Sequence, residues 1–466
     1  MKPVVTAAEM RAADESALAH VSHQTLVTRA GTAVGVAALH IMGGSYGRRV
    51  IVVVGKGSNG ADGRVAADYL ARRGVRVTVF GAAAAPTQLA PCDLVIDGAY
   101  GTGFHGTYTA PQVHDGTPVL AIDLPSGLNA DTGSASDGAT HATHTVTFAA
   151  HKTGLLQGDG PRLSGAIEVA DIGIDIGPSG AALITDDDID RLLPARPRTS
   201  HKWSTAVGIA AGSVGMEGSA VLSSRGAMAA GAGMIRLGSP GNPTGNWPVE
   251  AVRMQLTTSR WGGALLAGTA KCRALVIGPG LGTDSATKEE VQSVIASCTL
   301  PLVIDADGLT ALGDLPMAKF LIGVRKAPTV LTPHDGEYAR LTGAPPSADR
   351  LASARDLARR LGAIVLLKGP LTAVASPEDG VPDVLLSTAG VPALATAGTG
   401  DVLSGIIGAF IARGVAPHEA AALAAHVHGR AAASHRQQGL VAGDLPALVA
   451  AVLSRNDRPN DERHDG

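Results

Sequence analysis

The chain of 466 residues is poor in aromatic side chains, which make up 3% of it, and it has only three cysteines. With few aromatics, the cores must be filled by Ala, Val, Leu and Ile, and such small residues suit helices packed closely on a sheet. The cysteines, Cys92, Cys272 and Cys298, are odd in number and far apart, which excludes a disulfide framework and a zinc-binding spacing. A reducing compartment, the cytoplasm, is therefore expected.

Long apolar runs and basic clusters are also missing. No stretch of 18 apolar residues is unbroken, and the first residues alternate between polar and apolar instead of forming the core of a signal peptide. The formal net charge is −3, from 38 Lys and Arg against 41 Asp and Glu, and the basic residues occur in short pairs. These features predict neither a membrane nor a nucleic-acid partner.

The length exceeds what one hydrophobic core usually supports, which predicts two domains. Thr6 followed by Glu9 forms a capping-box pattern, so a helix is expected to open the first domain, residues 1–180. Functional loops are expected at one edge of its sheet, beyond the strand C-termini. Short apolar runs predict parallel strands over 50–54, 75–80, 93–97, 118–123 and 143–148.

A change in composition marks the end of this domain. Residues 181–199 are rich in proline and charge, and we interpret them as an interdomain region. A second α/β domain is then expected over 200–455, followed by a polar tail, 456–466, expected to be disordered. Its predicted strands cover 207–211, 234–237, 274–277, 301–305, 329–332 and 363–367.

The strongest local signal is the run AGTGDVLSGIIGAFIARG, in which Gly398, Gly400 and Asp401 open an apolar-periodic helix. The free backbone N–H groups and the positive end of such a helix predict an anion site. Asp401, at the edge of that site, is placed to take a proton from a substrate hydroxyl while the amides neutralise a transferring phosphoryl group. Alone, the pattern fits an N-cap aspartate in a glycine turn equally well.

Four further loops follow predicted strands upstream. They read GPGLG at 278–282, DADG at 305–308, TPHDGE at 332–337 and KGPLT at 368–372. Each is a strand end that leads into a polar or glycine-rich loop, and together they predict one nucleotide crevice. Taken singly, His334 is more often a loop histidine and Lys368 a surface charge, so it is their joint order that favours a site.

In this order, together with GSxxxxGSAVL at 212–222, the motifs resemble the NAD(P)H-hydrate dehydratases, a branch of the ribokinase-like superfamily. The resemblance implies a ribokinase-like α/β fold, ADP as co-substrate, and Mg²⁺ with the nucleotide. The preference for ADP over ATP comes from the bacterial fused members by analogy alone. The implied nucleotide contacts are Lys368, Gly369, Pro370, Leu371, Thr372 and Gly400. The implied contacts of the hydrated dinucleotide are Ser219 or Ala220, Gly280 or Gly282, His334 and Asp401.

The N-terminal half carries GKGSNGADG at 55–63, DGAYGTG at 97–103 and AIDLPSG at 121–127. The first loop is neither GxGxxG nor GxxxxGK[ST], so it matches no standard nucleotide motif. Asn59, Asp97 and Ser126 offer oxygen atoms suited to a hard cation, and Asp123 is a carboxylate at a strand end, where catalytic groups often lie in open α/β sheets. As isolated residues, these would also fit caps and turns.

Together these motifs resemble the NAD(P)H-hydrate epimerase domain, a Rossmann-like three-layer fold. The family loop GNNGGDG has Ser58 and Ala61 as departures here, and alanine is expected to restrict a backbone angle that glycine allows. The resemblance implies K⁺ held by Asn59, Asp97 and Ser126. The implied dinucleotide contacts are Ser58, Asn59, Gly60, Ala61, Asp62, Gly101, Thr102, Gly103, Phe104, His105, Gly106, Thr107 and Asp123.

The two halves together predict repair of hydrated NADH and NADPH. Epimerisation of the R and S hydrates needs an acid–base group, for which Asp123 is the candidate, and the S form is then dehydrated as ADP becomes AMP and phosphate. Two alternatives stay open: the C-terminal half is a small-molecule kinase with a stable phosphorylated product, or the N-terminal half is a silent binding module. The expected partners are small molecules, and homo-oligomers are common for such domains.

Overall fold

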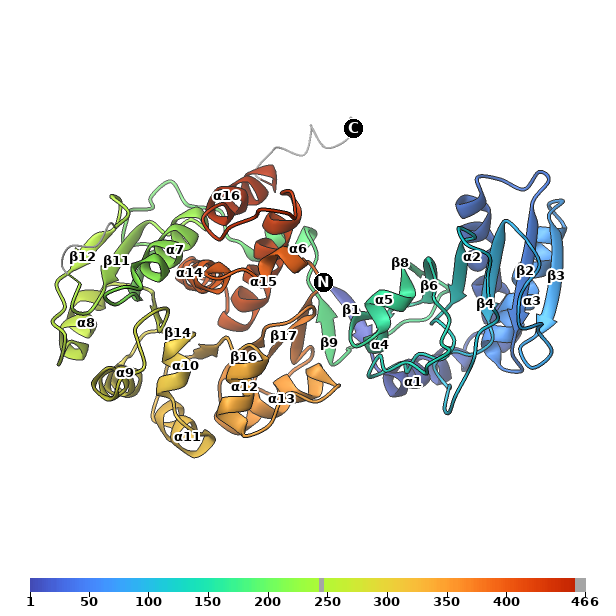
Figure 1. The fold of residues 1–466 in the computed structure, drawn as a ribbon. Helices are drawn as coiled ribbons and strands as arrows, with labels where there is room; N and C mark the ends of the chain where they lie inside the picture. Colours follow the sequence, from blue (N-terminus) through green and yellow to red (C-terminus); the bar gives the residue numbers. More distant parts are fainter. Residues whose placement is uncertain (243–246, 457–466) are drawn as a thin grey trace. The chain divides into compact units, whose positions relative to one another are not determined.

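The computed structural model describes residues 1–242 and 247–456. The chain divides into two compact units, Lys2–Ala181 and Ala182–Gly466, the second of which also includes Met1. Each unit has its own sheet and its own core, and Figure 1 traces the chain through both. The polar tail expected over 456–466 lies outside the described residues except for Asn456, where the last helix ends.

The N-terminal unit is built on a six-stranded, fully parallel sheet in the order β3-β2-β4-β5-β6-β8. All five predicted strands are present, and β8 is an additional edge strand that the apolar pattern did not reveal because its residues are largely half-exposed. A short parallel pair, β1 and β7, lies outside this sheet. The strands are β1 (Lys2–Val5), β2 (Arg49–Val54), β3 (Arg76–Gly81), β4 (Leu94–Gly98), β5 (Val119–Ile122), β6 (His144–Phe148), β7 (His151–Lys152) and β8 (Ala166–Ala170).

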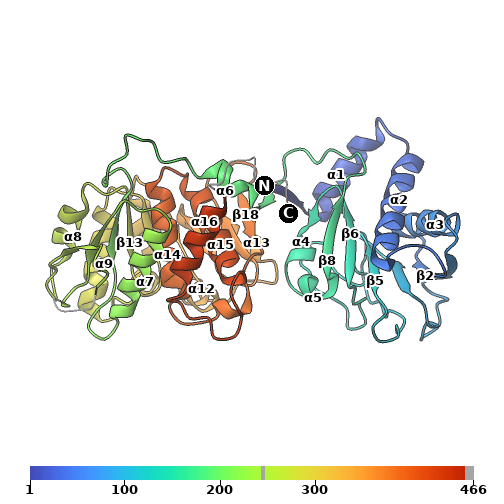
Figure 2. The ribbon, with the colours of Figure 1, turned by 90° about the horizontal axis from the view of Figure 1, so that it is seen from above.

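The helices of this unit are α1 (Ala7–Leu18), α2 (His23–Met42), α3 (Ser58–Ala71), α4 (Thr153–Leu156) and α5 (Gly160–Ser164). The predicted capping box at Thr6 and Glu9 is confirmed at the start of α1. Helices α2 and α3 run side by side along one face of the sheet (Figure 2). Their contact needs glycine, because a Cβ on Gly31 would lie 2.5 Å from the Cβ of Val65.

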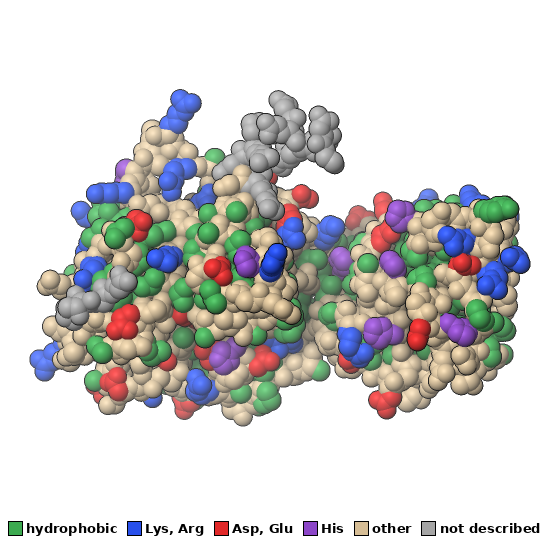
Figure 3. Space-filling view, turned by 45° about the horizontal axis from the view of Figure 1, so that its top comes forward, with side chains coloured by type: hydrophobic (Ala, Val, Ile, Leu, Met, Phe, Trp, Pro, Cys, Tyr) green, Lys and Arg blue, Asp and Glu red, His purple; other side chains and the backbone are tan. Residues whose placement is uncertain are grey.

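Helix α2 is the one described helix that is long and apolar enough to cross a membrane by length and composition. Half of its apolar window is buried inside the unit, where Ala30, Val34 and Ala38 join the core formed with β2, β4 and β5. Packing on the sheet therefore accounts for its apolar face. On the face drawn in Figure 3, the basic side chains of the described residues are scattered among acidic ones and form no continuous patch.

The C-terminal unit has a sheet in the order β12-β11-β10-β13-β14-β15-β16-β17-β18-β9, parallel from β12 to β16, with β17 antiparallel to both of its neighbours. All six predicted strands of this half are confirmed. The strands are β9 (Ala181–Leu183), β10 (Ala206–Ala210), β11 (Met234–Gly238), β12 (Val252–Met254), β13 (Ala274–Ile277), β14 (Leu302–Ile304), β15 (Thr329–Leu331), β16 (Ile364–Leu367), β17 (Thr372–Ala375) and β18 (Val384–Ser387).

Two helical layers enclose this sheet (Figure 1). One layer consists of α7 (Glu217–Ala229), α14 (Thr399–Ala412), α15 (Pro417–Ala433) and α16 (Leu445–Asn456). The other consists of α8 (Gly262–Thr269), α9 (Ser285–Ser297), α10 (Asp307–Ala311), α11 (Leu315–Gly323), α12 (Asp335–Thr342) and α13 (Arg350–Leu361). A 3₁₀ turn, Pro392–Leu394, precedes α14. The unit is therefore a three-layer α/β/α domain.

Helix α14 lies at the centre of the core and packs backbone-to-backbone against α7. A Cβ on Gly405 would lie 2.0 Å from the carbonyl oxygen of Ser223, and one on Gly226 would lie 2.4 Å from the carbonyl oxygen of Val402. Neither position has room for a side chain. The helix that opens the predicted anion site is thus held by the tightest contact in its layer.

Residues 181–199, expected to connect two domains, contain β9 and a short helix, α6 (Asp187–Leu192). Ile184 and Ile189 join the core of the C-terminal unit, and Asp188 is buried there. The composition of this segment did not predict its strand, its helix or its core residues, because its few apolar residues are separated by charges and prolines.

Candidate functional site

The C-terminal candidate site lies where the parallel strands β13, β14 and β16 end. Gly278, Asp305 and Lys368 follow these strands directly. The register pairs Ile277 with Ile304 across β13 and β14, so their loops leave the sheet at the same edge. The structure therefore brings together loops that lie up to 90 residues apart in the chain, as 368 − 278 = 90.

Asp305 is the buried centre of this edge, with 1% of its surface exposed. Its carboxylate accepts hydrogen bonds from Lys368 Nζ at 2.6 Å, from Ser404 Oγ at 2.5 Å and from the Ala306 amide at 2.9 Å. Burial opposes its ionisation, but Lys368 and these donors hold its pKa below the usual range. Burial likewise opposes the charge of Lys368, and Asp305 outweighs it, so the pKa of Lys368 is raised. The pair is an ion pair at neutral pH.

The N-terminus of α14 lies beside this pair. Its N-cap is Gly398, at φ 88°, so Asp401 is the third residue of the helix and not its cap. A Cβ on Gly400 would lie 3.4 Å from Lys368 Nζ, which places the lysine charge against the first turn of the helix. Within the described chain, the amides of Gly400 and Asp401 make no hydrogen bond. Free donors and a fixed cation thus meet at one point.

Asp401 has the environment of a proton acceptor. Burial raises its pKa to about 6, although a side-chain hydrogen bond with Ser219 acts in the opposite direction. A carboxyl group with this pKa is mostly ionised at neutral pH and is still a better base than an exposed aspartate.

The residues expected to meet the hydrated dinucleotide are only partly gathered around Asp401. Ser219 lies against Gly280, whose Cβ would be 2.8 Å from the serine side chain. The amide of Gly282 donates to Asp307 at 2.9 Å. Ala220 is completely buried and faces Gly212, so its methyl group is turned into the core. Of the expected pairs, Ser219 and Gly280 are therefore the members in contact.

His334 is the N-cap of α12 and is 56% exposed. Its Nδ1 accepts the amides of Gly336 at 3.0 Å and Glu337 at 3.2 Å, which leaves Nε2 to carry the proton of the neutral ring. The imidazole is thus oriented by the helix start, and its Nε2 lies 3.5 Å from Glu337 Oε1 on a half-exposed ring that a ligand can reach.

The expected nucleotide loop, residues 368–372, follows the same edge. Leu371 is 2% exposed and so belongs to the core, whereas Gly369 is close to Arg350, whose Nη2 donates to the carbonyl oxygen of Lys368 at 2.7 Å. Pro370 lies between them in the turn, and Thr372 begins β17. Arg350 was not foreseen from the sequence, since nothing near it in the chain distinguishes it from other helical arginines.

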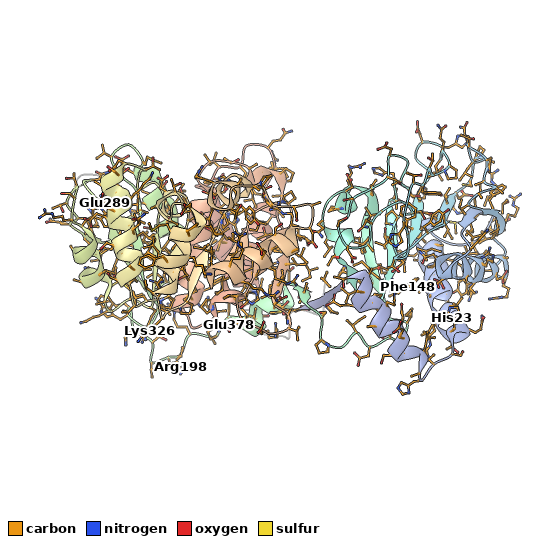
Figure 4. The ribbon with its side chains drawn as sticks, turned by 90° about the horizontal axis from the view of Figure 1, so that it is seen from below. His23, Phe148, Arg198, Glu289, Lys326 and Glu378 are labelled. Carbon is orange, nitrogen blue, oxygen red and sulfur yellow. The ribbon has the colours of Figure 1, made fainter. Side chains whose placement is uncertain are left out.

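The N-terminal candidate site is a cavity of about 330 Å³ in the first unit. Its apolar lining includes Met10, Leu26 and Val27. Two lining residues from different elements, His23 on α2 and Phe148 on β6, are labelled in Figure 4. The polar lining includes Asp14, Ser58, Asn59, Asp62, Thr102, Asp123 and Lys152.

Asp123 follows β5 in a left-handed conformation, φ 65°, which is strained for a residue with a Cβ. Its Oδ1 accepts hydrogen bonds from Lys152 Nζ at 2.5 Å and Thr147 Oγ1 at 3.0 Å. Lys152 is 1% exposed and also donates to Thr147 Oγ1 and to the carbonyl oxygen of Phe148. Lys152 was not predicted from the sequence, although its place shortly after a predicted strand was a signal.

Two further carboxyl groups face the same cavity. Asp62 on α3 is 5% exposed, and burial, followed by the charges of Asp123 and Asp14, raises its pKa to about 8. Asp14 on α1 also has a raised pKa, chiefly because it is half-buried. Asp14 was not predicted either, because it reads as an exposed helix residue in the sequence.

The three expected cation ligands lie together. Ser126 Oγ donates to Asp97 Oδ1 at 2.7 Å and to the carbonyl oxygen of Tyr100 at 3.2 Å, and Asn59 Nδ2 donates to the same carbonyl at 3.2 Å. Asp97 is 3% exposed, and no basic side chain in the described ranges pairs with it. Burial raises its pKa. A buried carboxylate with oxygen neighbours and no counter-charge suits a monovalent or hard cation.

The remaining expected substrate residues are divided between α3 and a second cavity. Gly60 and Ala61 lie in α3, where Ala61 has no positive φ, so the expected backbone restriction was wrong. A Cβ on Gly101 would lie 2.3 Å from Asn59 Oδ1, and Gly103 has open space around it. Another cavity, of about 620 Å³, is lined by residues including Phe104, His105, Gly106 and Thr107.

The architecture and the strand-end site define the C-terminal unit as a ribokinase-like domain. In agreement, a ribokinase-like superfamily protein of Enterococcus faecalis V583 matches 60% of this chain and 98% of its own, with a TM-score of 0.52 and 22% identity. A family model described as NAD(P)H-hydrate dehydratase matches residues 207–455. A second model, described as YjeF-related protein N-terminus, matches residues 23–88 and 80–154.

Full-length relatives cover both units. The bifunctional NAD(P)H-hydrate repair enzyme Nnr of Mycobacterium tuberculosis H37Rv is 38% identical over 89% of this chain and 90% of the relative. That of Mycobacterium leprae is 37% identical over 97% of this chain and 98% of the relative. The chain belongs to the family of bifunctional NAD(P)H-hydrate repair enzymes.

Proposed function

We propose that this chain epimerises the hydrates of NADH and NADPH in an N-terminal epimerase domain, residues 1–180. A dehydratase domain, residues 200–455, then dehydrates the S form with ADP. The observation that supports the second activity is the meeting of a raised-pKa carboxyl, Asp401, with the Lys368–Asp305 ion pair at the open N-terminus of α14. This set of groups serves phosphoryl transfer to a hydroxyl.

In the first step of dehydration, Asp401 takes the proton of the ring hydroxyl, and the hydroxyl oxygen attacks the terminal phosphorus of ADP. The bond from that phosphorus to the bridging oxygen breaks, and AMP leaves. The amides of Gly400 and Asp401 and the charge of Lys368 stabilise the negative charge on the transferring group. Ser219 fixes the carboxyl group of Asp401 through its hydrogen bond.

The second step removes phosphate, which is a better leaving group than hydroxide. The lone pair of the ring nitrogen forms a C=N bond as the C–O bond breaks, and loss of a proton from the next carbon restores the double bond. The overall change is hydrate and ADP to reduced dinucleotide, AMP and phosphate.

In the epimerase domain, Asp123 is the acid–base group next to the ring, and its partner Lys152 holds the carboxyl group in place. K⁺ would be held by Asn59, Asp97 and Ser126, where it would supply the positive charge that the Asp97 carboxylate lacks. Mg²⁺ would bind mainly through the phosphates of the nucleotide. Among residues 1–242 and 247–456, no group of three His, Cys, Asp or Glu side chains could hold it.

Beyond these groups, we propose that ADP contacts residues 368–372 and Gly400, and that the hydrated dinucleotide contacts Ser219, Gly280 and His334 in the dehydratase domain. In the epimerase domain the dinucleotide would extend from the cavity at Asp123 toward residues 101–107. A cytoplasmic setting and a homo-oligomer remain predictions from the sequence.

The test is to incubate the full chain with both NADPH-hydrate epimers, Mg²⁺, K⁺ and either ADP or ATP, and to follow the reduced-nicotinamide absorbance. Complete recovery with accelerated epimer exchange is expected. Recovery that stops at the share of one epimer would refute the epimerase half. Accumulation of a stable phosphate ester without recovery would refute the dehydratase and favour the kinase.

A further inference from the structure

The cavity at Asp123 contains an imbalance of charge. Three of the carboxyl groups that line it are buried or half-buried, on Asp14, Asp62 and Asp123, and one buried cation, Lys152, lines it with them. The other charged or titratable lining residues, Arg11, Glu15 and His23, are exposed at the surface. Because like charges repel and burial disfavours the charged form, three ionised carboxylates with one cation are not stable together in a cavity of about 330 Å³.

The buried cation is fully committed to one of these carboxyl groups. Lys152 Nζ makes three hydrogen bonds, to Asp123 Oδ1, Thr147 Oγ1 and the carbonyl oxygen of Phe148. An ammonium group has three protons, so none remains for another partner. Asp123 is therefore the carboxyl group that is paired with the buried cation.

Asp62 is in the opposite situation. Its side chain lies on the buried face of α3 and lines the cavity, and among the described residues it has neither a hydrogen-bond donor nor a salt-bridge partner. Burial and its two acidic neighbours raise its pKa to about 8. At neutral pH the group thus holds a proton that it shares with no protein atom and that is free for a ligand in the cavity.

We propose that Asp62 is a second catalytic residue of the epimerase, a general acid that protonates the ring hydroxyl of the hydrated nicotinamide. This inference rests on the proposed function of the N-terminal unit. The proton of Asp62 goes to the hydroxyl oxygen, the C–O bond breaks with its electron pair to release water, and the ring nitrogen lone pair forms a C=N bond. Water then adds to the other face and returns a proton to Asp62.

The different roles of Asp62 and Asp123 follow from the residues around each carboxyl group. Asp123, which is paired with Lys152, stabilises the positive charge that develops on the ring, and Asp62 supplies the proton. Two carboxyl groups with different environments in one site are a common arrangement for acid–base catalysis.

The experiment uses the full chain without ADP, so that no dehydration takes place. The purified S hydrate of NADPH is supplied, and formation of the R epimer is followed by chromatography from pH 6 to pH 10, with the uncatalysed rate subtracted. The wild-type rate is expected to be level up to about pH 8 and to fall above it. Asp62→Asn is expected to lower kcat by about 10²- to 10⁴-fold with KM nearly unchanged.

Asp68→Asn is the matched control, since Asp68 lies on the same helix but is exposed. It should leave both the rate and the pH profile as they are. Asp62→Glu, which restores a carboxylic acid, should recover part of the rate and the fall above neutral pH, which a purely structural role would not predict.

The outcomes separate the two proposals. A wild-type chain that does not accelerate epimer exchange at any pH would overturn the epimerase function itself. Exchange whose rate does not fall at high pH would overturn the acid role of Asp62 without any variant. Exchange with an Asp62→Asn rate within twofold of wild type would overturn it as well.

Discussion

Removal of the lysine partner of Asp305 should destabilise the C-terminal unit more than removal of the aspartate. In Lys368→Met, Asp305 keeps Ser404 and Ala306 as donors but loses the cation with which it is paired, while remaining 1% exposed. Breaking a buried ion pair in this way costs about 3–5 kcal/mol. In Asp305→Asn the lysine is left alone, but its side chain is 22% exposed and can turn toward water, so the cost should be about 1.5–3 kcal/mol.

The assay can report on one unit alone, because all three tryptophans, Trp203, Trp247 and Trp261, lie in the C-terminal unit. Urea unfolding followed by tryptophan fluorescence at neutral pH therefore measures the unfolding free energy of that unit. Lys319→Met, a surface change on α11, is the matched control and should shift stability by less than about 0.5 kcal/mol.

The pH dependence has a defined sign. The folded-state pKa of Asp305 is lowered, so its ion pair stabilises the fold above the unfolded-state value of 3.8, and that stabilisation is lost as the pH falls through the lower folded-state value. The difference between wild type and Lys368→Met should thus be largest at neutral pH and should shrink in acid. The double variant should cost at least about 0.5 kcal/mol less than the sum of the singles. Additive costs, or a Lys368→Met cost equal to that of Lys319→Met, would refute the reasoning.

Three further predictions address the two candidate sites. Asp401→Asn should lower the dehydration rate by about 10²- to 10⁴-fold, and the wild-type kcat should rise with pH through about 6, where Asp401 loses its proton; a profile that is flat there would contradict its role as base. Gly60→Ala should reduce epimer exchange at least tenfold, because its Cβ would lie 2.0 Å from the carbonyl oxygen of Gly55, and unchanged exchange would show that the loop moves freely. Lys152→Met should destabilise the N-terminal unit by about 3–5 kcal/mol by leaving Asp123 buried without its cation, as measured by faster hydrogen exchange in β6, with exchange in the C-terminal unit as the internal control.

The strands and the loops that carry the sites could be predicted from the sequence because both are local patterns. A continuous apolar run identifies a buried strand such as β13 or β14, and the next polar residue marks its C-terminal end. That rule located Asp305, Lys368 and Asp123. It missed β8, whose residues are half-exposed at the edge of the sheet and therefore lack an apolar run.

The partners of these residues could not be predicted, because contacts between distant segments leave no periodic signal. Ser404 reaches Asp305 across 99 residues, and Lys152 reaches Asp123 across 29. The sequence also predicted that Ala61 would restrict a backbone angle in a loop, but the helix begins three residues earlier, at Ser58, and Ala61 has an ordinary conformation there. Burial raises the pKa of its neighbour Asp62. The mixed composition of the helix does not reveal that this residue is buried.

The glycine contact between α7 and α14 fixes the distance between two residues of the dehydratase site. Ser219 is carried by α7 and Asp401 by α14, and the two helices touch through the backbone at Gly226 and Gly405. A single added methyl group at either glycine would force the helices apart and lengthen the gap between base and serine, although neither glycine meets a ligand. The most sensitive positions for dehydration should therefore include residues deep in the helical layer, and a screen restricted to the lining of the site would overlook them.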